Sequence, residues 1–202
     1  MFNLIRKDIF LQKTTLLIML PLLVVYLFLE NSSIWGGIIF SIAITMNAYG
    51  IDEKSSINIL LNSLPYTRKE IVSSKYMGAF IYTGIVIFTV FIGNLIIHQE
   101  IMIWKDLLFI IGPVMVAISL IFPFSYKFKS QYMLIGALVS LAIYMVIIPL
   151  FIPNVNDKIR EVVQTLLTLQ TTYFYLIIVL SVMALYACSW LLSIRIYAKK
   201  VF

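Results

Sequence analysis

The polar stretch DEKSSINILLNSLPYTRKEIVSSK, residues 52–75, separates two long hydrophobic runs and holds seven of the 24 charged residues. It is therefore the longest polar interruption between two hydrophobic runs, and its own pattern is informative. Its first half carries apolar residues at spacings of three and four: Ile57, Leu60, Leu61 and Leu64. This spacing predicts one face of a short amphipathic helix. Asp52 is a candidate N-cap for that helix, and Pro65, which lacks an amide proton, predicts its end.

A second helix start follows directly. Thr67 and Glu70 have the spacing of a capping box, so a new helix is expected to begin there and rise into the next hydrophobic run. Arg68, Lys69 and Lys75 add positive charge beside the membrane. The short helix before Pro65 has two interpretations that the pattern alone does not separate. It is either a contact surface for another protein or a helix that lies on the lipid headgroups.

The composition excludes an ordinary soluble domain. Of the 202 residues 62% are hydrophobic and only 12% are charged, whereas soluble domains carry about 25% charged residues. Apolar runs of about 18 residues or more indicate membrane-spanning helices. We therefore predict a single all-α transmembrane domain over residues 1–202. Its six expected spans are 14–29, 34–51, 76–97, 107–126, 132–152 and 173–194.

Three further segments are expected to lie at the membrane surface. Residues 1–13 are amphipathic, with Phe2, Ile5 and Ile9 on one side, and predict an interfacial helix. Residues 52–64 are the short helix described above, and residues 156–170 predict an amphipathic helix on the opposite side of the membrane.

The basic residues give the orientation. With the N-terminus in the cytoplasm and alternating spans, twelve Lys and Arg side chains lie inside and three lie outside. This bias predicts that both termini and residues 52–75 are cytoplasmic. It also accounts for the net charge of +6 without a nucleic-acid partner.

Motifs for catalysis are missing from the sequence. The single histidine, His98, is expected in a solvated loop, so neither a His-based metal site nor a Ser–His–Asp triad is available. There is no phosphate-binding glycine loop of the known kinds. We expect no catalytic residue, no metal site and no bound cofactor. The single Cys188 is expected to be a small packing residue.

The spans carry uncharged polar residues instead of charges. Thr45, Asn47, Thr83, Thr89, Asn94 and Ser140 are candidates for a weakly polar cargo surface. The alternative is that they form hydrogen bonds between helices, each worth about 0.6–2 kcal/mol. Prolines 21, 113, 123 and 149 either kink their helices or break them as in secondary transporters.

Several stretches resemble the membrane subunits of ABC-2 type exporters. These are MFNLIRKD at the N-terminus, DEKSSINILLNSLPYTRKEIVSSKYM after the second span, FPFSYKFKS after the fourth and SIRIYAKKVF at the C-terminus. The central stretch is the most specific. The chain is most similar to the small permeases of phenol-soluble-modulin and bacteriocin peptide exporters.

The resemblance implies the six-span type V exporter fold of a bacterial plasma-membrane permease. Two separate ATPase subunits would bind ATP and Mg²⁺. A second permease copy or a related permease would complete the transmembrane core of the exporter, which membrane lipids would surround. Residues 52–64 would be the coupling helix. The residues expected to contact the ATPase are Asp52, Glu53, Ile57, Leu60, Leu61, Leu64 and Arg68. The implied function is ATP-driven export of an amphipathic cargo, with a peptide favoured over lipids, drugs or antibiotics. The alternatives are a stand-alone secondary transporter or channel and a non-transporting membrane scaffold.

Overall fold

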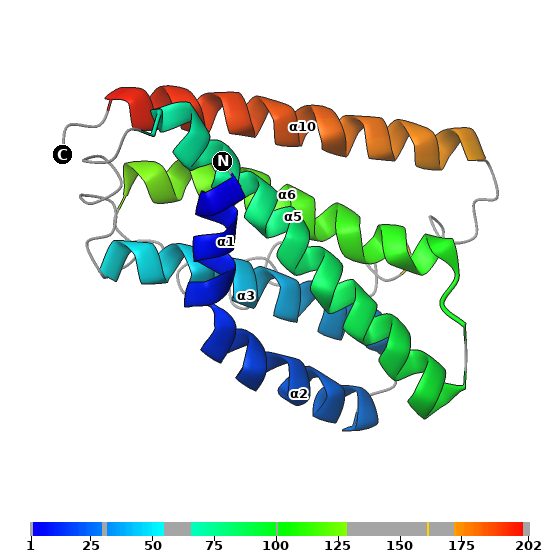
Figure 1. Ribbon diagram of the computed structural model, residues 1–202. Coiled ribbons are helices and arrows are strands. Elements are labelled where there is room, and N and C mark those ends of the chain that lie inside the picture. The colour runs from blue at the N-terminus through cyan, green and yellow to red at the C-terminus, as the bar shows by residue number, and fades with distance from the viewer. Residues whose placement is uncertain are drawn as a thin grey trace, which may run out of the picture.

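The computed structural model describes residues 2–29, 32–54, 66–99, 101–128, 161 and 172–199. Their regular structure is helical throughout (Figure 1), which confirms the all-α prediction for this part of the chain. The elements are α1 (Phe2–Leu11), α2 (Lys13–Leu29), α3 (Ser33–Lys54), α5 (Arg68–Gly93), the π-helix η1 (Asn94–His98), α6 (Trp104–Lys127) and α10 (Thr172–Lys199).

Four helices are long and apolar enough to cross a membrane: Ser33–Gly50, Arg68–His98, Trp104–Lys127 and Tyr175–Lys199. A fifth is counted if Asn3–Leu11 and Lys13–Leu29, which meet at a bend of 60°, form one span. The expected spans 34–51, 76–97, 107–126 and 173–194 fall within α3, α5 with η1, α6 and α10. The expected span 132–152 lies outside the described residues, as does the helix predicted over 156–170 apart from Glu161. Six spans therefore remain a prediction.

The N-terminal helix lies across the bundle instead of along it (Figure 1). The break between α1 and α2 falls at Gln12, next to the boundary expected between an interfacial helix and the first span. Pro21 lies inside α2, and Pro113 and Pro123 lie inside α6, which continues unbroken through both. The prolines of α6 therefore do not create a broken helix.

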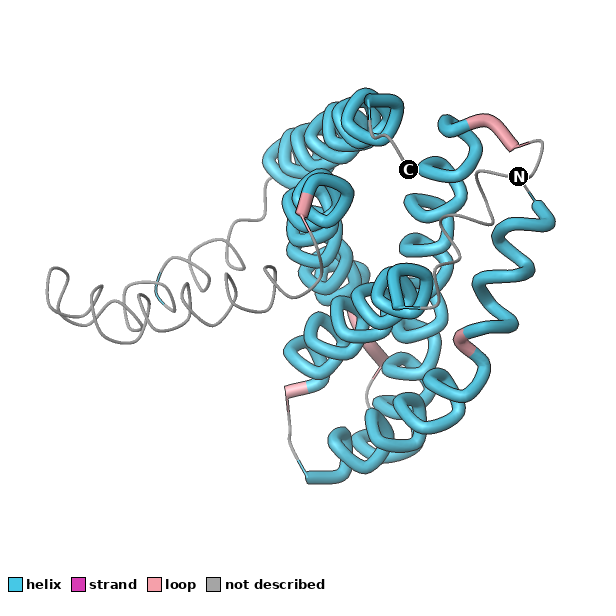
Figure 2. Tube along the Cα trace, turned by 90° about the vertical axis from the view of Figure 1, so that its left-hand side faces the viewer, coloured by secondary structure: helices cyan, strands magenta, loops and turns pink. Residues whose placement is uncertain are grey.

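Contacts along α6 and α10 show that these two helices run in the same direction. Trp104 contacts Tyr175, the backbone of Ser119 accepts a hydrogen bond from Ser189, and Tyr126 contacts Tyr197, so the residue numbers rise together. Helix α5 runs the opposite way. One end of the bundle consequently holds the end of α3, the start of α5 and the ends of α6 and α10 (Figure 1), and Figure 2 views the bundle from that end.

Helix α5 lies at the centre of the packing. Tyr82, Val86 and Val90 on α5 are almost completely buried, together with Ile44 of α3 and Ile110 of α6. The outward surface is apolar as well, with large exposed side chains on every long helix. Such a surface suits lipid, which solvates apolar side chains and excludes unpaired backbone groups.

Two single-residue expectations are wrong. His98 is half-buried as the last residue of η1, where its Nε2 is covered, and so it is not a solvated loop residue. Cys188 is exposed on α10 instead of packed inside the bundle. Cys188 lies in apolar sequence, which does not reveal the direction in which a helix faces, whereas the helical stretch before the loop extends through His98.

Candidate functional site

The start of α5 is where the described residues concentrate their polar contacts. The predicted capping box is confirmed: the Thr67 side chain accepts from the backbone N–H of Glu70, and the Thr67 backbone N–H donates to Glu70 Oε2 at 2.9 Å. This arrangement satisfies amide groups that a helix start leaves without partners. It fixes the point at which α5 emerges from the predicted coupling helix (residues 52–64).

Arg68 joins this helix start to the end of α10. Its Nη1 donates to the backbone oxygens of Tyr197 and Ala198, at 3.0 and 2.9 Å. The last carbonyls of a helix lack internal partners and carry partial negative charge, so a guanidinium is a favourable cap. Arg68, expected at the ATPase-facing rim, thus has a structural contact within the chain.

The next turn of α5 is buried and holds an ion pair. Lys75 Nζ lies 2.8 Å from Asp8 Oδ2, and the two side chains are only 9% and 4% exposed. Lys7 lies 3.1 Å from the other Asp8 oxygen. Because isolated charges are costly to bury, the contact with Asp8 favours the buried position of Lys75. Lys75 is therefore not simply a solvated positive charge beside the membrane.

Gln12 holds α1 to the third helix. Its Nε2 donates to the backbone oxygen of Ile44 at 2.8 Å, and the residue is 1% exposed. Leu4 and Asp8 of α1, and Gln12 directly after it, are all buried and lie about one turn apart, so they mark the side of this segment that packs on the protein. Sequence reasoning predicted an interfacial helix over residues 1–13 and singled out neither Asp8 nor Gln12. The spacing of four residues between Leu4, Asp8 and Gln12 was the available sequence signal that these side chains share one side of the segment.

The Tyr76 side chain links α5 to α10 by hydrogen bonds, and α10 is hydrogen-bonded to α6. Its hydroxyl lies 2.7 Å from the hydroxyls of both Ser189 and Ser193, and Ser189 donates to the Ser119 backbone oxygen at 2.6 Å. Tyr186 donates to the Tyr76 backbone oxygen at 2.8 Å. The cytoplasmic halves predicted for these three helices therefore form one hydrogen-bonded unit.

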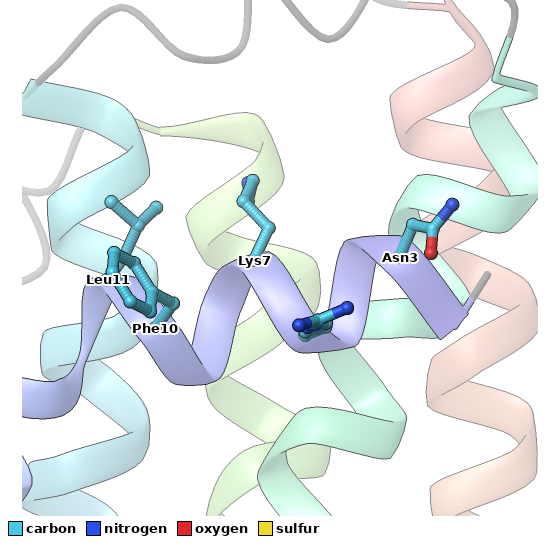
Figure 3. Close-up of a pocket in the computed structure, with 5 residues that line it drawn as sticks. Asn3, Lys7, Phe10 and Leu11 are labelled. Atoms are coloured by element: carbon cyan, nitrogen blue, oxygen red, sulfur yellow. The ribbon is translucent and has the colours of Figure 1, made fainter.

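The outer surface of α1 carries a shallow, open hollow that both polar and apolar side chains line. Its lining residues are Asn3, Arg6, Lys7, Phe10 and Leu11. Asn3, Lys7 and Leu11 project the same way from the helix (Figure 3), and Phe10 is 75% exposed. A surface of cationic and apolar side chains suits the boundary between headgroups and acyl chains.

The predicted ATPase contacts fall largely outside the described residues. Ile57, Leu60, Leu61 and Leu64 are among those not described. Asp52 and Glu53 belong to the last turn of α3, which continues to Lys54. Asp52 therefore does not begin a helix, because the helix of the expected second span extends through these charged residues. The two helices α3 and α5 flank residues 55–65.

Of the predicted cargo residues, the described ones mostly hydrogen-bond locally or lie apart from one another. The hydroxyls of Thr45, Thr83 and Thr89 donate to carbonyls four residues earlier in their own helices. Asn94 accepts from Ser33, which links η1 to α3. Asn47 is exposed, and Ser140 lies outside the described residues. Among the candidates that the structure describes, only Asn94 shows the hydrogen bond between helices that was weighed as the alternative. The threonine hydroxyls instead donate to carbonyls of their own helices.

Within the described residues, no three His, Cys, Asp or Glu side chains come together as a metal site. Several polar groups there join helices to one another, and the buried Asp8 and Lys75 form an ion pair. Together with the apolar outer surface, these features define a multi-pass helical membrane protein whose polar centre lies at one end of the bundle.

Comparison with protein families matches residues 3–198 to the ABC-2 family transporter protein family. The chain belongs to this family, whose members form the membrane domain of ABC transporters. No curated protein and no solved structure matches the chain significantly. The predicted ABC-2 resemblance is confirmed, and its narrower likeness to peptide exporters stays a prediction.

Proposed function

We propose that the chain is the permease subunit of an ATP-driven exporter in a bacterial plasma membrane. The observation that carries the proposal is the family match over nearly the whole chain. Members of this family work with ABC ATPase partners. Two ATPase subunits would bind ATP and Mg²⁺, and a second permease copy or a related permease would complete the core. We expect the chain itself to contribute no catalytic group and no cofactor site.

The direction of the helices supports the six-span topology. Since α6 and α10 run in the same direction, the chain has to return to the opposite end of the bundle between Phe128 and Thr172. Residues 132–152 form an apolar run long enough for that crossing. With α1 on the surface, the proposed spans in chain order are α2, α3, α5, α6, 132–152 and α10. An even number of spans would place both termini on one side, and the distribution of basic residues predicts that this side is the cytoplasm.

Residues 52–64 are proposed as the coupling helix. Ile57, Leu60, Leu61 and Leu64 would enter a cleft of the ATPase, because a helix in a groove binds through apolar residues spaced by three and four. Asp52, Glu53 and Arg68 would form the polar rim. ATP-dependent movement of this helix would act on α3 and α5, which flank it.

The proposed cargo is amphipathic, with a peptide favoured by the resemblance and lipids, drugs or antibiotics as competitors. The hydroxyls of Thr45, Thr83 and Thr89 already donate hydrogen bonds to their own helices, so they are less available to bind a polar group of the cargo. Among the candidates that the structure describes, Asn47 is exposed and is therefore the strongest candidate for contact with cargo.

The secondary transporter is less well supported. That alternative predicts a functional helix break at Gly112 and Pro113, whereas α6 continues through both residues. Only an experiment can distinguish the other alternative, a non-transporting scaffold, from a permease.

A pair of variants tests the proposed coupling helix. Leu60→Asp with Leu61→Asp should abolish co-purification of the ATPase while membrane insertion is kept, because two charges cannot enter an apolar cleft. The matched control is Ser55→Asp with Asn62→Asp, which adds the same charge to the other side of the predicted helix and should leave binding intact. Undiminished co-purification of the leucine variant would refute the assignment.

A further inference from the structure

We infer that the buried Asp8–Lys75 pair transmits movement of the coupling helix to α1 and through it to the first span. Asp8, Lys75 and Gln12 are then positioning residues of the transport cycle. This inference rests on the proposed function, because it requires an ATPase that moves residues 52–64. The pair is placed for the role by three observations.

The first observation is the pair itself. Lys75 lies less than two helical turns after Arg68, the first residue of α5, so a displacement of that helix start displaces its ammonium group. Asp8 meets this group at 2.8 Å in a site where both side chains are almost fully covered. Separating the two charges would break this ion pair inside a largely buried site, where the loss of an ionic contact is costly. The two helices are therefore expected to move together.

The second observation is that α1 also contacts the helix on the other flank of residues 55–65. Gln12 donates to the Ile44 backbone oxygen of α3, while Asp8 binds Lys75 of α5. Asp8 of α1 and Gln12, which directly follows α1, both lie on the side of this segment that packs on the protein. The opposite face is largely exposed, with Arg6 and Phe10 outward, so it does not resist such a movement by core packing.

The third observation is the geometry after Gln12. Helix α1 meets α2 at a bend of 60°, and the backbone continues between them through hydrogen bonds from Gln12 and Leu16. A shift of α1 is thus passed to α2, which forms the proposed first span. The route runs from the coupling helix to α5, across one ion pair to α1, and on to α2.

The experiment uses the complete complex of permease and ATPase, with Cys188→Ser to remove the exposed thiol. A bimane fluorophore is placed on α1 through Arg6→Cys, or on the first turn of α5 through Lys69→Cys. Both positions are exposed. Emission is recorded before and after trapping with ATP and vanadate. The tested variants are Asp8→Asn, Lys75→Met and the exchange of Asp8→Lys with Lys75→Asp, and the control is Lys13→Met at an exposed lysine.

In the unmodified complex, trapping should shift the emission at both positions. In Asp8→Asn and Lys75→Met, the shift at position 69 should persist, while the shift at position 6 should fall by about fourfold or more. The charge exchange should restore it, and Lys13→Met should leave both shifts unchanged. A shift at position 6 that survives in the single variants would overturn the inference. Loss at both positions would also overturn it, because the pair would then only hold the docking site in place.

Co-purification of the ATPase is measured on every sample. If no ATPase accompanies the unmodified chain, the proposed function fails and this inference fails with it. If the ATPase binds all variants and the two fluorophores respond alike, only the inference is refuted. A single substitution could lose the emission shift simply because it destabilises the fold. Restoration of the shift at position 6 by the charge exchange would show that the ion pair itself is required.

Discussion

Tyr76 offers the clearest test of the polar centre of the bundle. Its ring is 4% exposed and makes edge contacts with Phe122 and Tyr186 at centroid distances of 5.0 and 5.1 Å. Its hydroxyl bonds both Ser189 and Ser193. Tyr76→Phe removes only the hydroxyl, whereas Tyr76→Ala also removes the ring. The two substitutions therefore separate hydrogen bonding from packing.

The expected costs follow from those contacts. Hydrogen bonds between membrane helices average about 0.6 kcal/mol each, so the loss of two predicts about 1–2 kcal/mol for Tyr76→Phe. Ser189 keeps the Ser119 backbone oxygen as a partner, which limits the penalty. Deleting a buried aromatic ring costs about 3–5 kcal/mol, so Tyr76→Ala should be clearly worse. Thr83→Val, which removes a hydroxyl bonded only within its own helix, should cost about 0.5 kcal/mol or less.

The assay is unfolding of the purified chain by SDS in mixed micelles, followed by tryptophan fluorescence. Trp190 is a suitable reporter because its Nε1 donates to Ser73, three residues from Tyr76. If Tyr76→Phe were as mild as Thr83→Val, the hydroxyl would not join α5 to α10. If it were as damaging as Tyr76→Ala, the packing argument would be wrong.

Three further predictions concern packing, helix capping and topology. Gly93→Ala should destabilise the chain by about 1–3 kcal/mol in the same SDS assay, because its new Cβ would lie 2.5 Å from Leu27 Cδ1. Gly84→Ala, in open space on the same helix, is the control and should be close to neutral. Arg68→Ala should loosen the end of α10, seen as faster hydrogen exchange near Tyr197, while Lys69→Ala should not; equal exchange in both would contradict the cap. In a Cys188→Ser background, membrane-impermeant thiol reagents added to intact cells should label Lys105→Cys but spare Lys127→Cys and Lys199→Cys. Labelling of all three would overturn the proposed orientation.

Sequence reasoning predicted the helices well where composition decides them. Apolar runs gave α3, α5, α6 and α10, and the pairing of Thr67 with Glu70 located the start of α5. The end of α3 was placed too early, because three charged residues after Ile51 were taken as the end of one helix and the start of another. Charge is compatible with a helix that has already left the hydrocarbon region.

The site was harder to predict because its contacts join distant residues. Asp8 and Lys75 are 67 residues apart, and each had a plausible solvated position in its own segment. Tyr76 and Ser193 are 117 residues apart. Periodicity reports which residues share a helix face but not which face meets another helix. The threonines show the same limit, since a hydroxyl in a span bonds its own helix or another with no difference in sequence.

The central claim is that this chain works as the membrane half of an ATP-driven exporter. The most direct measurement is native mass spectrometry of the tagged chain, purified from its own membrane in mild detergent. The account predicts a complex that contains two copies of an ATPase subunit and two permease chains, identical or related. A chain that emerges alone, as a monomer or homodimer with no ATPase bound, would contradict it.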